Sequence, residues 1–268
     1  MIIDFHAHVF PERIAARTVA LLEKNAGTHA HSDGTAEGLE KRLVEAGVDL
    51  ALNLPVLTSP TQFESVLGFA EGLNLKRAEG ARVLSFAGMH PGLDDIEGRM
   101  RLIKEKGFLG VKIHPDYQGR FINDPGYIRI IECARDLDLI VVTHSGVDEA
   151  FTDAPVRCTP ELALEVCRRV PYRKMVFAHL GANEMFEEVL DALADREVYF
   201  DTANVLPKIS EETFMRTLSR IGEDRILFAT DSPWSGIKES IEIIKSFSLR
   251  KEAEEKIFAK NAMALLGV

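Results

Sequence analysis

The stretch Ile2–Phe10, IIDFHAHVF, is a short apolar run that ends in two histidines one residue apart. Similar runs recur along the whole chain, and each is followed by a longer segment with helical spacing. Runs that are almost continuously apolar are typical of strands covered on both faces, and their alternation with helices predicts parallel strands. We place eight strands at Ile2–His6, Asp49–Leu54, Val83–Ala87, Leu109–His114, Leu139–His144, Met175–His179, Val198–Thr202 and Ile226–Thr230.

The helical pattern is clearest in three of the connecting segments. In Thr35–Ala46 two leucines lie four residues apart, and we expect Gly47, which follows, to cap the C-terminus. In Glu184–Leu193 the apolar residues share one face, and we expect Asn183 to cap the N-terminus. The closing stretch Arg250–Leu266 has the spacing of one helix or of two short ones.

Eight β/α units in a chain of 268 residues predict an α/β fold, a closed (β/α)₈ TIM barrel that forms a single domain over residues 1–268. No linker rich in Pro, Gly or Ser divides the chain. An open doubly wound sheet is the alternative, but no Gly-x-Gly-x-x-Gly follows the first strand and no Gly-x₄-Gly-Lys-Ser/Thr occurs. The usual nucleotide sites of that alternative are therefore missing.

The charge balance disfavours nucleic acid as a partner. Lys plus Arg number 32 and Asp plus Glu number 42, so the formal net charge is −10. Such a chain repels a phosphate backbone unless its positive charges are segregated on one face. The pairs Arg168-Arg169 and Arg173-Lys174 lie beside predicted helix ends, which is typical of solvated helix termini. We expect a small-molecule substrate, and the sequence leaves assembly into a homo-oligomer open.

The cysteines and the N-terminus indicate a cytoplasmic protein. Cys133, Cys158 and Cys167 cannot all pair and none belongs to a Cys-x-x-Cys, so we expect reduced thiols in the role of small buried hydrophobes. The N-terminus has no basic region followed by an apolar stretch, and no run reaches the roughly 18 apolar residues of a membrane span. We therefore expect neither a signal peptide nor a membrane segment.

Polar residues gather where the predicted strands end. In a barrel of this kind the active site forms at the C-terminal ends of the strands. One histidine at such an end is most often a satisfied core residue, but five of the eight histidines share this level. Buried imidazoles and carboxylates need partners, and a divalent cation satisfies several at once. The residues at this level are His6, His8, Lys112, His114, His144, His179, Asp201 and Asp231.

The spacing of the first pair favours metal binding. Residues i and i+2 of a strand point to the same side, so His6 and His8 project together and can hold one ion. The later strands add His144, His179 and Asp231 from around the ring. Imidazoles with one carboxylate suit Zn²⁺ best, with Mn²⁺ and Fe²⁺ as alternatives, and a coordination position left for water makes the site catalytic.

Four motifs carry a resemblance to a known family. They are IIDFHAHVF, GVKIHP, FAHLG and FATDSPW, and the closing Lys260-Asn261-Ala262 followed by Leu265-Leu266-Gly267 extends the likeness over the whole chain. Together they resemble the amidohydrolase superfamily, in particular its amidohydrolase-related branch, also called amidohydrolase 2. That branch contains metal-dependent hydrolases, decarboxylases and hydratases, so the resemblance is specific for fold and metal rather than for substrate.

The resemblance implies roles for the residues of the barrel mouth. His6, His8, His144 and Asp231 would surround the more constant metal position, and Asp231 would also accept a proton from the metal-bound water. His179 would be either a ligand of a second metal or a hydrogen-bond donor that polarises the substrate.

The fourth strand departs from the family pattern, because binuclear relatives often place a glutamate or a carbamylated lysine there as a bridging ligand. Here Lys112 and His114 share a face. Three alternatives stay open: Lys112 is modified, His114 is a ligand, or both contact the substrate. The number of ions, one or two, stays open with them.

Metal-activated water and this ligand set favour a metal-dependent hydrolase that acts on an amide, ester or lactone bond of a small polar substrate. In this mechanism Asp231 takes the proton and His179 or a second metal stabilises the oxyanion. The alternative is a metal-dependent non-oxidative decarboxylase of an aromatic or unsaturated carboxylic acid. A metal-binding scaffold without turnover is disfavoured because no ligand is missing, and the net charge disfavours a nuclease.

Two long loops over the barrel mouth, residues 115–125 and 145–159, carry the candidate substrate contacts. Arg120 and Arg157 are candidates to hold a substrate carboxylate, although an arginine on a polar loop is more often a plain surface residue. Trp234 is a candidate pocket wall, with ordinary packing as the alternative.

Three further polar features have simpler interpretations. We expect Asp201 to support the ligands and Asp4 to support the first strand from within the barrel. A second His-x-His, His29-Ala-His31, lies among glycine and polar residues without an apolar strand, which predicts a solvated loop.

Overall fold

The computed structural model describes all 268 residues and confirms the predicted barrel of parallel strands. The strands are β1 Ile3–Ala7, β2 Leu50–Asn53, β3 Val83–Ser85, β4 Ala87–Gly88, β5 Gly110–Ile113, β6 Ile140–Thr143, β7 Met175–Phe177, β8 Tyr199–Asp201 and β9 Ile226–Leu227. They pair in chain order as β1-β2-β3 and β4 through β9. Strands β3 and β4 are two pieces of the third predicted strand, which is interrupted at Phe86.

The ring closes between the first strand and the last. The Phe5 N–H donates to the Phe228 carbonyl at 2.9 Å, and the Asp231 N–H donates to the His6 carbonyl at 2.8 Å. An isolated parallel bridge joins Ala7 to Ser232 just beyond them. The segment that follows the last strand is thus fixed directly against the first strand, which places Asp231 beside the His-x-His pair.

Apolar side chains fill both faces of the strands, as the uninterrupted apolar runs predict. One buried group fills the inside of the barrel and includes Phe5, Phe86 and Val142. A larger group lies between the strands and the surrounding helices and includes Val111, Val141 and Phe177. Neighbouring residues of one strand, such as Val141 and Val142, therefore serve the two cores in turn. The polar residues of the candidate site lie instead at the C-terminal ends of the strands.

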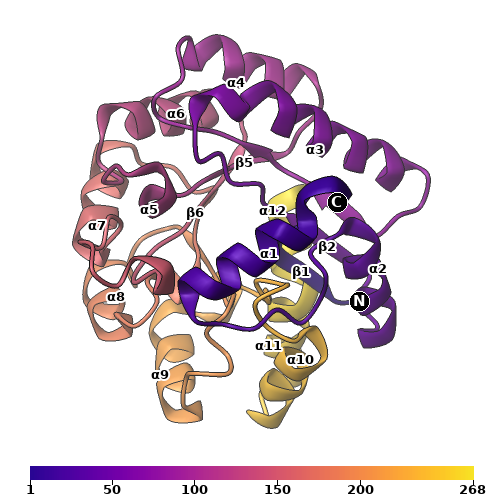
Figure 1. Cartoon of the computed structure of the whole chain (residues 1–268). Coiled ribbons are helices and arrows are strands. Elements are labelled where there is room, and N and C mark those ends of the chain that lie inside the picture. The colour runs from indigo at the N-terminus through magenta and orange to yellow at the C-terminus, as the bar shows by residue number, and fades with distance from the viewer.

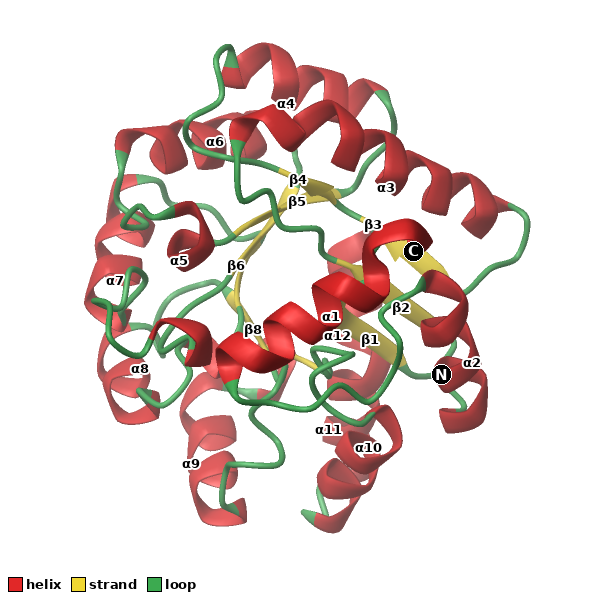
Figure 2. Ribbon diagram, viewed as in Figure 1, coloured by secondary structure: helices red, strands yellow, loops and turns green.

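Helices surround the strands on the outside, and α1 differs from them because it crosses in front of the barrel mouth (Figure 1, Figure 2). The helices are α1 Glu12–Ala26, α2 Ala36–Ala46, α3 Phe63–Ala78, α4 Ile96–Glu105, α5 Pro115–Gln118, α6 Pro125–Asp136, α7 Pro160–Arg169, α8 Phe186–Ala192, α9 Glu211–Ile221, α10 Ile237–Ser246, α11 Lys251–Glu255 and α12 Asn261–Leu266. No helix combines the length and the apolar character that crossing a bilayer requires.

The helix boundaries confirm two predictions and correct one. Helix α2 is capped as expected, since the Thr35 side chain accepts the Gly38 N–H and Gly47 ends the helix with φ 71°. The closing stretch forms two short helices, α11 and α12, joined by a π-helical segment Lys256–Lys260. Helix α8, however, begins only at Phe186, and Asn183 does not cap it.

The side chain of Asn183 has a different partner. Its amide donates to the Val147 carbonyl at 2.9 Å and so ties the loop after β6 to the loop after β7. Sequence spacing predicted that Asn183 caps the next helix. Its side chain instead makes a contact between two neighbouring loops. The three cysteines are free, with Cys133 and Cys158 buried, in agreement with the expected reduced thiols.

Candidate metal centre

The C-terminal end of the barrel brings together His6, His8 and Asp231. His8 Nε2 lies 3.1 Å and His6 Nε2 lies 3.3 Å from the same oxygen, Asp231 Oδ1. The two Nε2 atoms are 3.2 Å apart. Tetrahedral ligands with bonds of about 2.0–2.1 Å lie roughly 3.4 Å from one another, so these three atoms already have the spacing of ligands around one ion.

The backbone orients this cluster. The His8 N–H donates to the Ser232 carbonyl at 2.6 Å, so β1 and the turn after β9 are held in register. Asp231 has φ 66° and His179 has φ 60°, a left-handed conformation that costs free energy in residues other than glycine. Such strain clusters at functional sites, where the surrounding structure imposes it.

Three of the histidines place their outer ring nitrogen on an acceptor. His6 Nδ1 lies 2.9 Å from Asp201 Oδ2, His8 Nδ1 lies 2.9 Å from the Leu54 carbonyl, and His179 Nδ1 lies 2.8 Å from the Ala203 carbonyl. A carbonyl oxygen can only accept, so the proton of a neutral His8 or His179 is on Nδ1. The inward Nε2 atoms then carry the lone pairs that a metal needs. Asp201 therefore supports His6, as predicted from the sequence.

His179 and His144 continue the series of rings. His179 Nε2 lies 2.9 Å from His144 Nδ1, and the rings of His6 and His179 lie 5.6 Å apart between centroids. His114 stacks on His144 at 4.2 Å with an interplanar angle of 9°. The five imidazoles thus form one series of neighbouring rings, which runs from His8 through His6, His179 and His144 to His114. Because His179 Nε2 carries a lone pair in its neutral form, the geometry favours a ligand or acceptor role over the donor role.

Burial and charge set the protonation of the cluster. Burial lowers the pKa of His6 and of His144 well below the usual imidazole value. Burial alone would raise the pKa of Asp231, but the contacts with His6 and His8 outweigh it and hold that pKa below its ordinary value. Neutral imidazoles beside an ionised carboxylate are the forms that bind a divalent cation, so the donor set fits Zn²⁺, Mn²⁺ or Fe²⁺.

Lys112 enters the same cluster from β5. Its Nζ lies 3.2 Å from His6 Nε2, and the side chain is 1% exposed. Burial lowers its pKa to about 8, against the opposing effect of Asp201 and Asp231. An amine with this pKa is partly neutral near pH 8, so the structure leaves both the unmodified and the carbamylated lysine compatible with the site.

A second cluster lies on the far side of the mouth and contains a residue that the sequence did not indicate. His114, His144 and Asp148 hold their ligand atoms within 4.8 Å of one another. His114 Nε2 lies 3.5 Å from Asp148 Oδ2, and burial raises the pKa of Asp148 to about 6. Asp148 follows His144 by four residues in a loop, where it caps the 3₁₀ turn Glu149–Phe151 through the Ala150 N–H. Because residues in a loop show no strand periodicity, no pattern in the sequence indicated Asp148.

Above the clusters lies a cavity of about 510 Å³ with an apolar outer wall. Its lower part is formed by the histidines, Lys112, Asp148 and Asp231, and Trp234 is part of its lining. Helix α1, which crosses the mouth in Figure 1, the segment just before it and helix α3 provide most of the apolar side chains. The apolar wall residues are Val9, Phe10, Ile14, Leu22, Val66 and Phe69.

Two predicted substrate contacts lie elsewhere. Arg120 is partly exposed and pairs with Asp124 at 3.3 Å, outside the cavity lining. Arg157 is also outside that lining, and its Nη1 lies 3.4 Å from Asp116 Oδ1. Both loops reach the mouth as expected, but the two arginines form ion pairs with Asp124 and Asp116 of the first loop. Sequence could place the loops over the barrel but could not show which charges pair within them.

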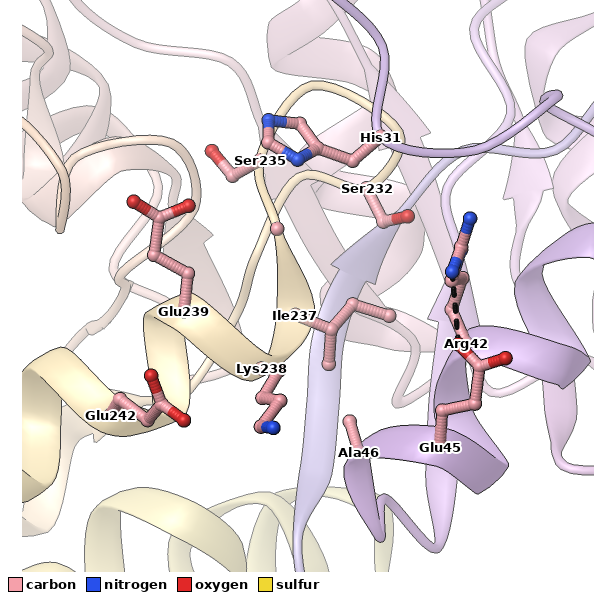
Figure 3. Close-up of a pocket in the computed structure, with 11 residues that line it drawn as sticks. His31, Arg42, Glu45, Ala46, Ser232, Ser235, Ile237, Lys238, Glu239 and Glu242 are labelled. Atoms are coloured by element: carbon pink, nitrogen blue, oxygen red, sulfur yellow. Dashed lines mark hydrogen bonds and ion pairs between the residues drawn. The ribbon is translucent and has the colours of Figure 1, made fainter.

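Of the other three histidines, His90 was not assigned a place from the sequence, and His29 and His31 lie in an exposed loop as predicted. His90, just after β4, is 6% exposed and its Nδ1 accepts the Gly92 N–H at 2.9 Å. His29 is solvated and pairs with Glu23. His31 lines a separate surface pocket between α2 and α10, where Figure 3 shows its ring above Ser232 and Glu239. Asp4 accepts the Thr230 N–H at 2.9 Å inside the barrel, as expected for a residue that supports β1.

Comparisons with known proteins show the family of the chain and agree with its fold. A family model described as Amidohydrolase matches residues 3–268. A search of curated protein sequences finds no match. Among solved structures, a dihydroxybenzoic acid decarboxylase from a Polaromonas species, with bound manganese, is 16% identical with a TM-score of 0.70, over 99% of this chain and 96% of that chain.

Two other solved structures with this fold belong to a second decarboxylase and to a protein described as a hydrolase. The 5-carboxyvanillate decarboxylase of Sphingomonas paucimobilis is 16% identical with a TM-score of 0.68, over 100% of this chain and 99% of that one. A probable 2-pyrone-4,6-dicarboxylic acid hydrolase of Acinetobacter baumannii, with bound citric acid, is 14% identical with a TM-score of 0.66, over 100% and 99%. At these identities the likeness concerns the fold.

Proposed function

Because this chain belongs to the amidohydrolase family, we propose that it is a metal-dependent enzyme and that its reaction is the non-oxidative decarboxylation of an aromatic or unsaturated carboxylic acid. The sequence favoured hydrolysis first and decarboxylation second. The observation that reverses this order is the cavity, in which an apolar wall faces a cluster of buried histidines, Lys112 and Asp231. Ligand sites of this kind bind the apolar body of a ligand and orient it through a few polar groups.

The substrate class follows from the two halves of the cavity. Phe10, Ile14 and Phe69 offer a surface for a planar ring or an unsaturated chain. Lys112, whose ammonium group faces His6, favours an anionic group at the bottom. Decarboxylases of hydroxylated aromatic acids among the structural neighbours give further support.

The metal would be held by His6, His8 and Asp231, with His144 and His179 beside them. We propose Zn²⁺ or Mn²⁺, the first from the ligand types and the second also from the manganese in one neighbour. When bound, a divalent cation would orient the substrate carboxylate or hydroxyl group and stabilise negative charge on it.

The residues of the chain carry the proton transfer. Decarboxylation breaks the bond between the ring carbon and the carboxyl group, leaves the electron pair on the ring carbon, and requires one proton there as CO₂ departs. Asp231 lies at the bottom of the cavity, where its carboxyl group can act as the general acid once it has taken a proton from solvent. We propose that Asp231 transfers this proton to carbon while the wall formed by α1 excludes water.

Hydrolysis of a lactone or amide is the second candidate, supported by the hydrolase among the neighbours. It uses the same residues, with Asp231 accepting a proton from water instead of giving one to carbon. Both reactions need the cluster of His6, His8 and Asp231, so loss of that cluster does not distinguish decarboxylation from hydrolysis. The identity of the product distinguishes the two reactions.

The experiment incubates the metal-loaded protein in D₂O with 2,6-dihydroxybenzoate, 5-carboxyvanillate and 2-pyrone-4,6-dicarboxylate. We expect CO₂ release with one deuterium at the carbon that carried the carboxyl group, and release slower by about 10²–10⁴-fold with Asp231→Asn. Ring opening of the pyrone without CO₂ release would overturn the proposal in favour of hydrolysis. Absence of any product from all three acids would also overturn it for this substrate class.

A further inference from the structure

One histidine of the mouth breaks a pattern that the others share. His6, His8 and His179 each place Nδ1 against an oxygen acceptor within 2.9 Å. In His144 it is Nδ1 that points to the other rings, and the outer nitrogen is therefore Nε2. His144 Nε2 is buried and has no hydrogen-bond partner.

A second unpaired atom lies opposite. Asp116 Oδ2 is also buried and without a hydrogen-bond partner, and it lies 3.8 Å from His144 Nε2. Buried polar atoms are rarely left unpaired, because such an atom has lost its hydrogen bonds to water without a replacement. Two such atoms that face each other form an incomplete hydrogen bond that a shift of less than 1 Å would close.

The position of the imidazole proton decides whether this bond forms. If the proton is on His144 Nδ1, it can be donated to His179 Nε2, but then a bare Nε2 lone pair faces the oxygen of Asp116. If the proton is on Nε2, it points at Asp116, and the Nδ1 lone pair is free toward the cluster. A cation between His144 Nδ1 and His179 Nε2 would require the second arrangement. Binding of the ion and formation of the hydrogen bond to Asp116 therefore favour each other.

Asp148 is the competing acceptor, since its Oδ2 lies 3.9 Å from His144 Nε2. That oxygen is already near His114 Nε2, at 3.5 Å, and the other oxygen caps the 3₁₀ turn. Asp116 has no competing contact on Oδ2, and Arg157 holds its other oxygen. Asp116 also belongs to the short helix α5, directly after the strand end that carries His114, which fixes its position.

We propose that Asp116 is a positioning residue for the metal centre: it accepts a hydrogen bond from His144 Nε2, and so keeps the Nδ1 lone pair directed at the ion, while Arg157 holds Asp116 in place. Arg157 then acts through Asp116 rather than on the substrate. This proposal concerns metal binding and holds for a decarboxylase and a hydrolase alike.

The test measures Zn²⁺ affinity by chelator competition in the wild type, Asp116→Asn and the control Asp153→Asn, a surface carboxylate on the loop that carries Arg157. Loss of such a supporting carboxylate weakens metal binding about 10–100-fold. We expect a loss in this range for Asp116→Asn, no change for the control, and equal melting temperatures of the three metal-free proteins. A merely structural role would lower the melting temperature of metal-free Asp116→Asn and leave the affinity per folded molecule unchanged, and would overturn the proposal.

Arg157→Gln gives a second measurement in case Asp116→Asn does not fold. It leaves Asp116 in place without its partner, and we expect a weaker affinity than in the wild type by a smaller factor than for Asp116→Asn. The Co²⁺-substituted protein should show altered d–d absorption in both variants, because the field at His144 changes. Wild-type affinity and an unchanged Co²⁺ spectrum in both variants would contradict the proposal. So would a fall from two bound ions to one at unchanged affinity, since Asp116 would then be a ligand of a second ion.

Discussion

The two sides of the barrel mouth hold clusters of the same composition, each with two histidines and one aspartate, but the chain builds them differently. In the first, a backbone hydrogen bond from Asp231 to His6 joins the segment after β9 to β1. In the second, Asp148 comes from a loop and is held by a local cap. The comparison indicates that the strand framework fixes the metal ligands, while loops provide groups that can change with the substrate.

The comparison predicts different effects of losing one imidazole on each side. His8→Ala removes a ligand atom from the first cluster, and we expect the purified protein to lose its tightly bound metal and its activity. His114→Ala removes a ring from the second cluster, and we expect the metal to be retained. Metal analysis of both variants after dialysis checks this. Equal loss of metal from both would show that the two clusters are not distinct.

The next largest effect is expected on kcat, from the loss of the carboxyl group that transfers the proton. Asp231→Asn keeps the size of the side chain but cannot transfer a proton, so kcat should fall by about 10²–10⁴-fold. The measurement is kcat at saturating metal, with circular dichroism to confirm the fold, because Asp231 also belongs to the ligand cluster. If kcat stayed near that of the wild type, another group would transfer the proton.

A smaller effect is expected on the loop side. Asp148→Asn removes a negative charge that lines the cavity and faces His114. A carboxylate substrate is repelled less without that charge, so we expect KM to fall about tenfold, the equivalent of roughly 1.4 kcal/mol, with metal affinity retained. Steady-state kinetics and metal titration of the same preparation measure both quantities. A loss of metal without a change in KM would assign Asp148 to the metal centre instead.

The smallest effect should come from Arg120. Its side chain is 44% exposed and pairs with Asp124 on the surface, and exposed ion pairs contribute about 0–1 kcal/mol. Arg120→Gln should therefore change the free energy of unfolding by less than about 1 kcal/mol and leave KM nearly unchanged. A large rise in KM would restore the role in substrate binding that the sequence suggested.

The residues explain why some features were predictable and others were not. His6, His8, His144 and Asp231 end apolar runs, and the barrel brings the ends of all its strands to one level, so their meeting follows from the fold. Asp116 lies in the one-turn helix α5 and Asp148 lies in a loop, and neither segment is long enough for a periodicity to link position to direction. The pairing of Arg157 with Asp116 joins two such short segments, and the contact of Asn183 with Val147 joins two loops. Contacts of this kind depend on how the loops pack rather than on local sequence.

We propose that His6, His8 and Asp231 form the primary metal site of the barrel. X-ray diffraction at the absorption edge of the metal that remains bound after purification without chelators tests this proposal. We expect an anomalous peak within about 2.0–2.2 Å of His6 Nε2, His8 Nε2 and an oxygen of Asp231. An anomalous peak only between His114 and Asp148, or no peak in protein shown to be folded and active, would contradict it.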